Sequence, residues 1–275
     1  MLKMDKLRFG PAGVPLSSSK RDTLSGIEKT YELGLDTMEL EFVYGVKLKD
    51  EDAIEAKSLS KKYDIVLTAH APYYVNLNAK EEAKRKRSIQ MLKDSIRALA
   101  LAGGWSVVFH PGWYMKSTKE EAYRKVKESL REVVNYAKEF SFKVWIRPET
   151  MEGEKKFGDL DEVIKLSQEL EMVLPCIDFA HLRYRYKNNS LDFFREILEK
   201  VEKELGKEAL KEMHIHMSGI KLDKAGTHVN LEESDMPWKE ILELLKEFGV
   251  CGVVISESPN IEGDAILMRD YWKKL

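Results

Sequence analysis

Short apolar runs alternate along the chain with longer segments of helical periodicity. The runs are LRFG (7–10), TMELEF (37–42), IVLTAH (65–70), SVVFH (106–110), KVWIR (143–147), MVLPCID (172–178), MHIHM (213–217) and CGVVISE (251–257). Apolar residues recur every three or four positions in the segments between several of them, namely 79–102, 118–139, 159–170, 191–204 and 237–248. Such spacing is typical of amphipathic helices. The pattern therefore predicts eight strands that alternate with helices.

Regular alternation of this kind favours a parallel sheet with right-handed crossovers. Eight strand-helix units close naturally into a (β/α)₈ TIM barrel, a fold of about 250 residues. We therefore expect residues 1–275 to form a single α/β domain. The alternative is a doubly wound open sheet, although no GxGxxG follows the first strand as its dinucleotide-binding form requires.

Composition adds expectations about the setting of the protein. Charged residues make up 33% of the chain and glutamine is rare, a composition typical of thermophilic sources. The two cysteines, Cys176 and Cys251, form no CxxC, and the first residues carry no secretory signal. We therefore expect a cytoplasmic protein without disulfides. No apolar run reaches the roughly 20 residues that span a bilayer, so no membrane association is expected.

The charge balance allows only local contacts with a polyanion. The net charge is −2, which is not typical of a general nucleic-acid binder. Two basic clusters follow segments that carry candidate ligands: Lys80 with Lys84, Arg85, Lys86 and Arg87, and Arg183 with Arg185 and Lys187. Each cluster is interpreted either as a local anion contact or as a solvated surface.

Histidines gather near the ends of the predicted strands. The six are His70, His110, His181, His214, His216 and His228, and five of them lie at or just beyond the carboxyl end of a strand. A single histidine in a strand is more often a packed core residue. Because TIM-barrel active sites are built at the carboxyl ends of the strands, the collection predicts a functional site there.

Carboxylates occupy equivalent positions. Glu149, Asp178 and Glu257 each follow or close an apolar strand, where an ionised carboxylate is costly unless it is paired or bound to a cation. Imidazole and carboxylate ligands together suit Zn²⁺, Mn²⁺, Fe or Co rather than Mg²⁺ or Ca²⁺, which prefer all-oxygen shells. We therefore predict a metal site, with Zn²⁺ as the leading ion and Mn²⁺ as the alternative, held by His70, His110, Glu149, Asp178, His216 and Glu257.

The period of two along a strand separates neighbouring candidates. His214 and His216 face the same side of their strand, so His216 is expected at the rim and His214 one layer deeper in a supporting role. Arg147 precedes Glu149 by two positions. We expect it to bind a substrate phosphate or carboxylate, with a structural ion pair as the alternative.

Motifs around these residues resemble the endonuclease IV family, the zinc-dependent apurinic/apyrimidinic endonucleases of the xylose-isomerase-like barrel superfamily. The matching segments cover the third to eighth predicted strands in the family's order. They are HAPYYVNL (70–77), VVFHPG (107–112), RPETM (147–151), CIDFAH (176–181), HIHMSG (214–219), GTHVN (226–230) and ISESP (255–259). HAPY and FHPG are the most specific parts of this resemblance.

The resemblance implies a role for each matched residue. His70 and His110 hold one zinc ion, and Glu149 bridges it to a second, held also by Asp178, His216 and Glu257. Glu149 and Glu257 are accordingly the expected catalytic carboxylates. A third zinc in the family is held by residues matching His181 and His228 and by an Asp two positions before the latter. Gly226 stands there in this chain, so the third site is weak, absent, completed by water, or completed by Asp223.

The resemblance also implies a substrate and a reaction. The family hydrolyses the phosphodiester 5′ to an abasic site in base excision DNA repair, so DNA with abasic sites, or another phosphate ester, is the expected partner of a monomeric enzyme. Tyr73 and Tyr74 match the residues that wedge into DNA, although packing over the barrel mouth is the alternative. RFGPAGVP and the loop after ELEF depart from the family.

Two other functions remain open at this point. A sugar isomerase or epimerase of the same superfamily uses one divalent metal, for which Glu149, Asp178, His216 and Glu257 suffice. His70 and His110 favour the nuclease, because an isomerase has less use for them. The third possibility is a barrel that has kept its ligands as a binding module, with Gly226 as an early loss.

Overall fold

Eight parallel strands form the centre of the computed structural model, which describes residues 1–223 and 226–275. They are β1 (Leu7–Pro11), β2 (Thr37–Glu41), β3 (Val66–His70), β4 (Ser106–Phe109), β5 (Trp145–Pro148), β6 (Cys176–Asp178), β7 (Met213–Met217) and β10 (Gly252–Ser256). Hydrogen bonds join them in two four-stranded sheets, β1-β10-β7-β6 and β2-β3-β4-β5. All six strand pairs within these sheets are parallel.

Isolated parallel bridges between residue pairs join the two sheets edge to edge and close the barrel. Ala12 pairs with Glu39 between β1 and β2, and Glu149 pairs with Cys176 between β5 and β6. The first seam depends on Gly10, because a Cβ atom there would lie 1.8 Å from the carbonyl oxygen of Thr37. The predicted (β/α)₈ barrel is confirmed, and the open doubly wound sheet is excluded.

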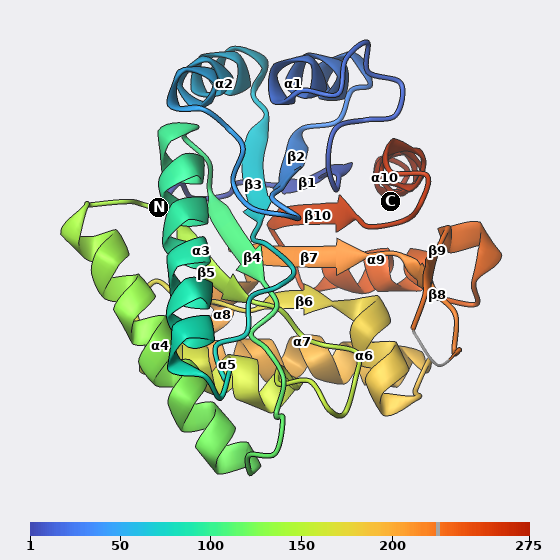
Figure 1. Cartoon of the computed structure of the whole chain (residues 1–275). Helices are drawn as coiled ribbons and strands as arrows, with labels where there is room; N and C mark the ends of the chain where they lie inside the picture. The colour runs from blue at the N-terminus through green and yellow to red at the C-terminus, as the bar shows by residue number, and fades with distance from the viewer. Residues whose placement is uncertain (224–225) are drawn as a thin grey trace.

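Helices surround the strands on the outside of the barrel (Figure 1). They are α1 (Thr23–Glu32), α2 (Asp50–Tyr63), α3 (Glu82–Leu101), α4 (Lys119–Glu139), α5 (Leu160–Glu169), α6 (Phe179–Tyr186), α7 (Leu191–Leu205), α8 (Lys207–Leu210), α9 (Trp238–Glu247) and α10 (Glu262–Trp272). The five helices predicted from periodicity correspond to α3, α4, α5, α7 and α9. A short hairpin of β8 (Gly219–Ile220) and β9 (His228–Val229), followed by a 3₁₀ turn at Leu231–Glu233, extends the loop after β7.

Local sequence explains where individual helices begin. Helix α4 starts at a capping box in which the Thr118 hydroxyl accepts from the amide of Glu121, and the Glu121 carboxylate accepts from the amide of Thr118. This arrangement satisfies two amides that the first turn leaves unpaired. Val126, Leu130 and Val133 then fall on the buried face of the helix. Helix α2 has no such cap, because its N-cap residue is Lys49, whose side chain accepts no hydrogen bond.

One strand is shorter than its apolar run predicts. The run 172–178 yields β6 only from Cys176 onward. Met172 has a left-handed backbone with φ of 62°, and Pro175 has no amide hydrogen to donate to a neighbouring strand. Regular pairing therefore begins immediately after the proline.

The two faces of β2 and of β7 differ sharply in polarity. On β2, Met38 and Leu40 join the apolar core between strands and helices, whereas Glu39 is buried on the other face, toward His214 and His216. The same alternation along β7 sends Ile215 to the apolar core. The barrel interior is consequently rich in ionisable groups, which need partners because they are shielded from water.

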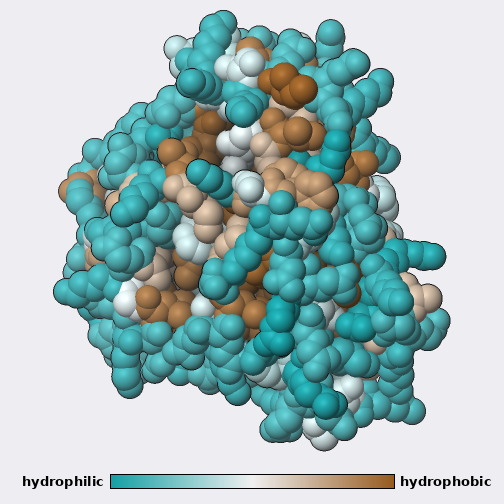
Figure 2. All heavy atoms as spheres, turned by 90° about the vertical axis from the view of Figure 1, so that its left-hand side faces the viewer, coloured by the Kyte–Doolittle hydropathy of each residue, from teal (hydrophilic) through white to brown (hydrophobic). Residues whose placement is uncertain are grey.

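Apolar residues close the amino-terminal end of the barrel. A small buried cluster comprises Met4, Val66, Trp105, Val253 and Ile255. Figure 2 shows the molecule from the left-hand side of Figure 1, the side on which the barrel strands begin. On this face, hydrophobic residues gather near the centre and hydrophilic residues surround them. Among the described residues, no helix is both long and apolar enough to cross a membrane.

Arg147 lies below the rim, at a position different from the one expected. Its side chain is only 1% exposed and donates to the carbonyl oxygens of Pro175 and Glu212, just before β6 and β7. The guanidinium also lies 4.7 Å from the ring centroid of Trp105. The expected contact with substrate therefore has no support in this geometry, and Arg147 braces β5 against β6 and β7.

We predict that Arg147→Met lowers the free energy of unfolding by on the order of 3 kcal/mol, because it leaves two buried carbonyl oxygens without donors. Chemical denaturation followed by circular dichroism measures the change. Arg195→Met, which removes a surface pair with Glu247, serves as the control and should barely alter the midpoint. Equal midpoints for wild type and Arg147→Met would contradict the bracing role.

Candidate metal centre

Strand register brings the predicted ligands to one level of the barrel. Glu41 pairs with His70 across β2 and β3, and Asp178 pairs with His216 across β6 and β7. Pro72 and Pro111 follow His70 and His110 closely and stop the strands there, because proline cannot continue a central ladder. The carboxyl ends of parallel strands meet at one edge, so these side chains converge.

Glu149 lies at the centre of the group and is fully buried. One carboxylate oxygen, Oε2, lies 3.3 Å from His70 Nε2 and 3.2 Å from His110 Nε2. The other, Oε1, lies 3.4 Å from His216 Nδ1 and 3.1 Å from His181 Nδ1. The two oxygens of one carboxylate thus face two different sets of imidazole nitrogens, as the oxygens of a bridging ligand would.

The structure brings all eight predicted ligands together in three overlapping groups. Within each group, one donor atom per residue lies within 4.8 Å of the others. The groups are His70 with His110 and Glu149; Glu149 with Asp178, His216 and Glu257; and Asp178 with His181 and His228. Glu149 and Asp178 each belong to two groups, so neighbouring cations in this centre would share carboxylates.

Several donor atoms in these groups fit a cation. Among the described residues, Glu149 Oε1, Asp178 Oδ2 and His216 Nδ1 are buried without a hydrogen-bond partner. An unpaired buried polar atom costs about 1–3 kcal/mol, and more when it is charged. Divalent metal ions would satisfy these atoms together, and the mixture of imidazole and carboxylate suits Zn²⁺.

Charge coupling within the centre is strong even without an ion. Burial disfavours the ionised form of Glu149, yet the histidines around it, His110 first, hold its pKa well below the usual value. Burial likewise opposes protonation of His70, but the hydrogen bond to Glu149 and nearby carboxylates raise its pKa to about 9. Protons and metal ions would therefore compete for the same positions in this centre.

Hydrogen bonds from the backbone orient two of the imidazoles. His70 Nδ1 lies 2.7 Å from the carbonyl oxygen of Ala71, and His181 Nδ1 lies 3.0 Å from that of Thr150. In the neutral form of each ring Nδ1 is consequently the donor, and Nε2 presents the lone pair that a metal would take.

Helix α6 starts inside the centre. Asp178 is its N-cap, and Oδ1 accepts from the amide of His181 at 2.6 Å. The Thr150 hydroxyl in turn accepts from the amide of Asp178 at 2.8 Å. Because the helix begins directly after β6, His181 falls one turn from Asp178 and enters the same site.

Glu39 is a buried partner of the centre that the sequence interpretation missed. Its two oxygens lie 3.1 Å from His214 Nε2 and 3.0 Å from His216 Nε2, and Ser106 Oγ lies 2.7 Å from His214 Nδ1. The predicted deeper position of His214 is thus observed. Glu39 orients His216, as carboxylates behind metal-ligating histidines commonly do. The sequence did offer one signal for Glu39: it stands two residues before Glu41 at the end of a strand, so both carboxylates face the same side.

Aromatic side chains cover the mouth of the centre. Tyr73 stacks on His110 with ring centroids 5.4 Å apart, and its hydroxyl donates to Glu41 at 3.2 Å. Tyr74 projects further, with 66% of its surface exposed, and lies near the exposed Tyr44. Trp113, on the loop after β4, is another exposed aromatic residue that the sequence interpretation did not single out.

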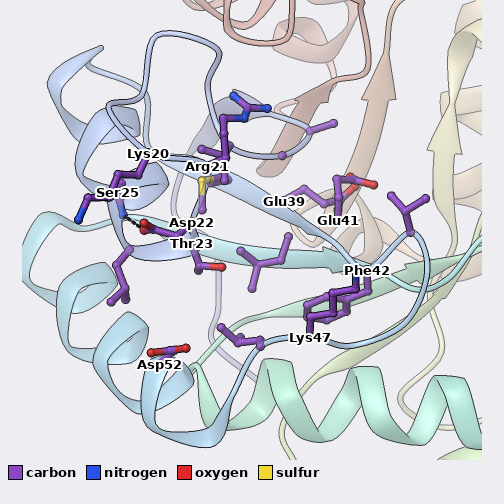
Figure 3. Close-up of a pocket in the computed structure, with 18 of the residues that line it drawn as sticks. Lys20, Arg21, Asp22, Thr23, Ser25, Glu39, Glu41, Phe42, Lys47 and Asp52 are labelled. Atoms are coloured by element: carbon purple, nitrogen blue, oxygen red, sulfur yellow. Dashed lines mark hydrogen bonds between the residues drawn. The ribbon is translucent and has the colours of Figure 1, made fainter.

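Two cavities meet at this end of the barrel. The smaller, of about 360 Å³, is lined by His110, His181, His228 and Glu257. The larger, of about 870 Å³, lies between the loops after β1 and β2 and shares Glu41 with the first. In Figure 3, Lys20 and Arg21 beside α1 and Lys47 before α2 flank it, with Glu39 and Glu41 between them.

The two predicted basic clusters differ in their contacts. Arg183 bonds Asp235, and Arg185 donates to the carbonyl oxygens of Met151, Gly153 and Lys156. The second cluster thus has internal structural contacts. In the first, Lys84 and Arg85 pair with acidic residues one turn earlier on the exposed start of α3.

We predict that the purified chain binds at least two divalent ions, measured by inductively coupled plasma mass spectrometry, and that Glu149→Gln loses at least one of them. The amide is neutral and presents only one oxygen to a metal, so it cannot bridge two ions as the carboxylate can. Glu128→Gln, on the exposed face of α4, is the control and should keep the wild-type content. Fewer than two ions in the wild type would exclude a dinuclear centre.

Both the sequence and the structure of this chain resemble those of known proteins. A 42% identical, uncharacterised protein of Methanocaldococcus jannaschii aligns over 98% of each chain. A probable endonuclease 4 of Mycoplasma pneumoniae is 28% identical over 75% of this chain and 72% of its own. Endonuclease IV from Thermus thermophilus superimposes with a TM-score of 0.75 at 19% identity, covering 96% of this chain and all of the other.

The fold is about as similar to that of an epimerase-like protein as to that of endonuclease IV. A D-tagatose 3-epimerase-like protein superimposes with a TM-score of 0.73 at 22% identity and 96% coverage of both chains. At this level of identity both superpositions show the fold alone. The family model described as xylose isomerase-like TIM barrel matches residues 27–275. The chain therefore belongs to the family of xylose isomerase-like TIM barrels.

Proposed function

We propose that this protein is a zinc-dependent phosphodiesterase that cleaves DNA 5′ to abasic sites. The observation that carries the proposal is the position of His70 and His110. Both face the Oε2 atom of Glu149, whereas its Oε1 atom faces His216. A centre for two ions, rather than one, explains why both histidines converge on the same carboxylate oxygen.

The reaction adds the oxygen of water to phosphorus and breaks the bond to the 3′ oxygen. Two bound divalent ions would supply charge neutralisation at the phosphate and a water of lowered pKa. The resemblance of HAPY, FHPG and the other motifs to endonuclease IV, and the relatives named probable endonuclease 4, support this chemistry over other metal-dependent reactions of the barrel.

Glu149 and Glu257 are the proposed catalytic carboxylates. Glu149 is buried at the base of the site and fixes the spacing between the two ligand groups. Glu257 Oε1 lies 3.3 Å from His216 Nδ1, while the residue also lines the 360 Å³ cavity. Glu257 can thus contact both the ligand group and a phosphate or water in the cavity.

Exposed aromatic residues at the mouth suit a nucleic-acid substrate. An abasic site lacks one base, so its unstacking is less costly there than elsewhere in a duplex. Tyr74 is free to enter such a gap, whereas Tyr73 is held against His110 and Glu41. We therefore assign the wedge to Tyr74 and a packing and orienting role to Tyr73.

Sugar isomerisation or epimerisation is the second candidate. The group of Glu149, Asp178, His216 and Glu257 is sufficient for one ion. Glu149 and Glu257 both approach His216, at 3.4 and 3.3 Å, so two carboxylates could exchange protons with adjacent carbons of a bound sugar. This reaction leaves His70 and His110 without a role.

The direct test incubates the protein with a duplex that carries one abasic site, with and without chelator. We expect a nick immediately 5′ to the lesion that chelator abolishes and added Zn²⁺ restores, with binding that weakens as salt increases. An intact duplex of the same sequence is the control. Turnover of a ketose without any nick would assign the protein to the epimerases instead.

Tyr74→Ala should weaken binding to the abasic duplex about tenfold or more, since one stacked base contact contributes about 1–3 kcal/mol. Fluorescence anisotropy measures this affinity, and metal content should stay unchanged. Tyr31→Ala, an exposed tyrosine that stacks on Tyr63 of α2, is the matched control. Equal affinities for wild type and Tyr74→Ala would rule out the wedge.

A further inference from the structure

Two histidines next to the main centre bring their Nε2 atoms within hydrogen-bond distance of each other. His181 Nε2 and His228 Nε2 lie 3.1 Å apart. The other nitrogen of each ring has its own partner: His181 Nδ1 lies 3.0 Å from the Thr150 carbonyl oxygen, and His228 Nδ1 lies 3.2 Å from Ser218 Oγ. Nitrogen ligands about 2.0–2.1 Å from a tetrahedral zinc lie roughly 3.3 Å apart, so the pair is spaced for one shared ion.

Asp178 lies within reach of this histidine pair but also belongs to the group of Glu149, His216 and Glu257, so a zinc ion at the pair needs a carboxylate of its own. Position 226 does not provide it. Gly226 has a left-handed backbone, with φ of 65°. A Cβ atom built there would lie 3.4 Å from Cγ of Glu152 and 3.4 Å from the ring of Tyr184. A side chain at this position would therefore extend beside Glu152.

Asp223 does not face the histidine pair through its described contacts. Its Oδ1 accepts from the amides of Gly226 and Thr227 at 2.8 and 3.3 Å. Its Oδ2 accepts from the Thr227 hydroxyl at 2.9 Å. Both oxygens thus shape their own loop, and the alternative that Asp223 completes the site gains no support.

Glu152 directs one carboxylate oxygen toward the histidine pair. Its Oε2 lies 3.9 Å from His181 Nε2 and is buried without a hydrogen-bond partner among the described residues. Its Oε1 is bound by Lys156, one turn further along the chain. Lys156 therefore fixes one oxygen and leaves the other directed toward the histidine. Glu152, His181 and His228 also line the same 360 Å³ cavity.

We propose that Glu152 is the carboxylate ligand of a third zinc ion, which it holds with His181 and His228. The loop after β5 thereby supplies a ligand in place of the one missing from the β8–β9 hairpin. This inference concerns metal binding only, so it stands or falls separately from the reaction proposed above.

Zinc content per folded chain tests the assignment. Proteins dialysed against a buffered excess of Zn²⁺ and then freed of unbound ion are analysed by mass spectrometry, with circular dichroism to verify folding. We expect three zinc ions in the wild type and two in Glu152→Ala. Glu154→Ala, an exposed carboxylate two residues away, should retain three. Equal content in wild type and Glu152→Ala would overturn the proposal.

A compensating variant separates a ligand from a merely structural residue. Gly226→Asp in the Glu152→Ala background returns a carboxylate to the hairpin, and aspartate is among the residues that tolerate a left-handed backbone. We expect the double variant to regain the third zinc. A double variant that remains at two ions would contradict the idea that Glu152 and position 226 serve the same site.

Discussion

The burial of Glu149 is the constraint on which the rest of the site depends. A carboxylate at 0% exposure, removed from water, carries a penalty of several kcal/mol unless opposite charge surrounds it. Imidazoles from β3, the loop after β4, α6 and β7 all approach its two oxygens. The barrel brings them there because parallel strands present their carboxyl ends at one edge. Metal ions are the partners that match so many donors at once.

Strand alternation extends the same constraint below the rim. Strands β2 and β7 send apolar side chains outward to the helices and polar ones inward, and Glu39, His214 and Ser106 form a second buried layer. This layer is connected to the site, because the Glu39 carboxylate lies 3.0 Å from Nε2 of His216, on the side of the ring away from Glu149. A substitution within the layer would therefore disturb the ligand geometry without touching a ligand. Arg147 and the apolar cluster around Trp105 close the barrel beneath it.

Sequence alone predicted the barrel and six candidate ligands, since strand ends are visible as apolar runs that stop at His, Asp or Glu. The other two candidates, His181 and His228, came from the resemblance to the endonuclease IV family. The sequence interpretation placed His214 in the deeper layer of the barrel interior but did not place Arg147 there. Arg147 and Glu149 share a strand face, yet Arg147 bonds backbone carbonyls below the site. Glu39 was missed because its histidine partners come from a strand distant in sequence. Glu152 was missed for a similar reason. It lies next to Gly226 only in the folded chain, where the loop after β5 meets the β8–β9 hairpin.

We propose that Glu149 bridges two metal ions. Anomalous X-ray scattering at the zinc absorption edge tests this bridging role most directly. Crystals of the zinc-loaded protein should show a peak on each side of the Glu149 carboxylate. One peak should lie against His70 and His110, and the other against Asp178, His216 and Glu257. A single peak among the last three, with none beside the two histidines, would contradict the dinuclear account.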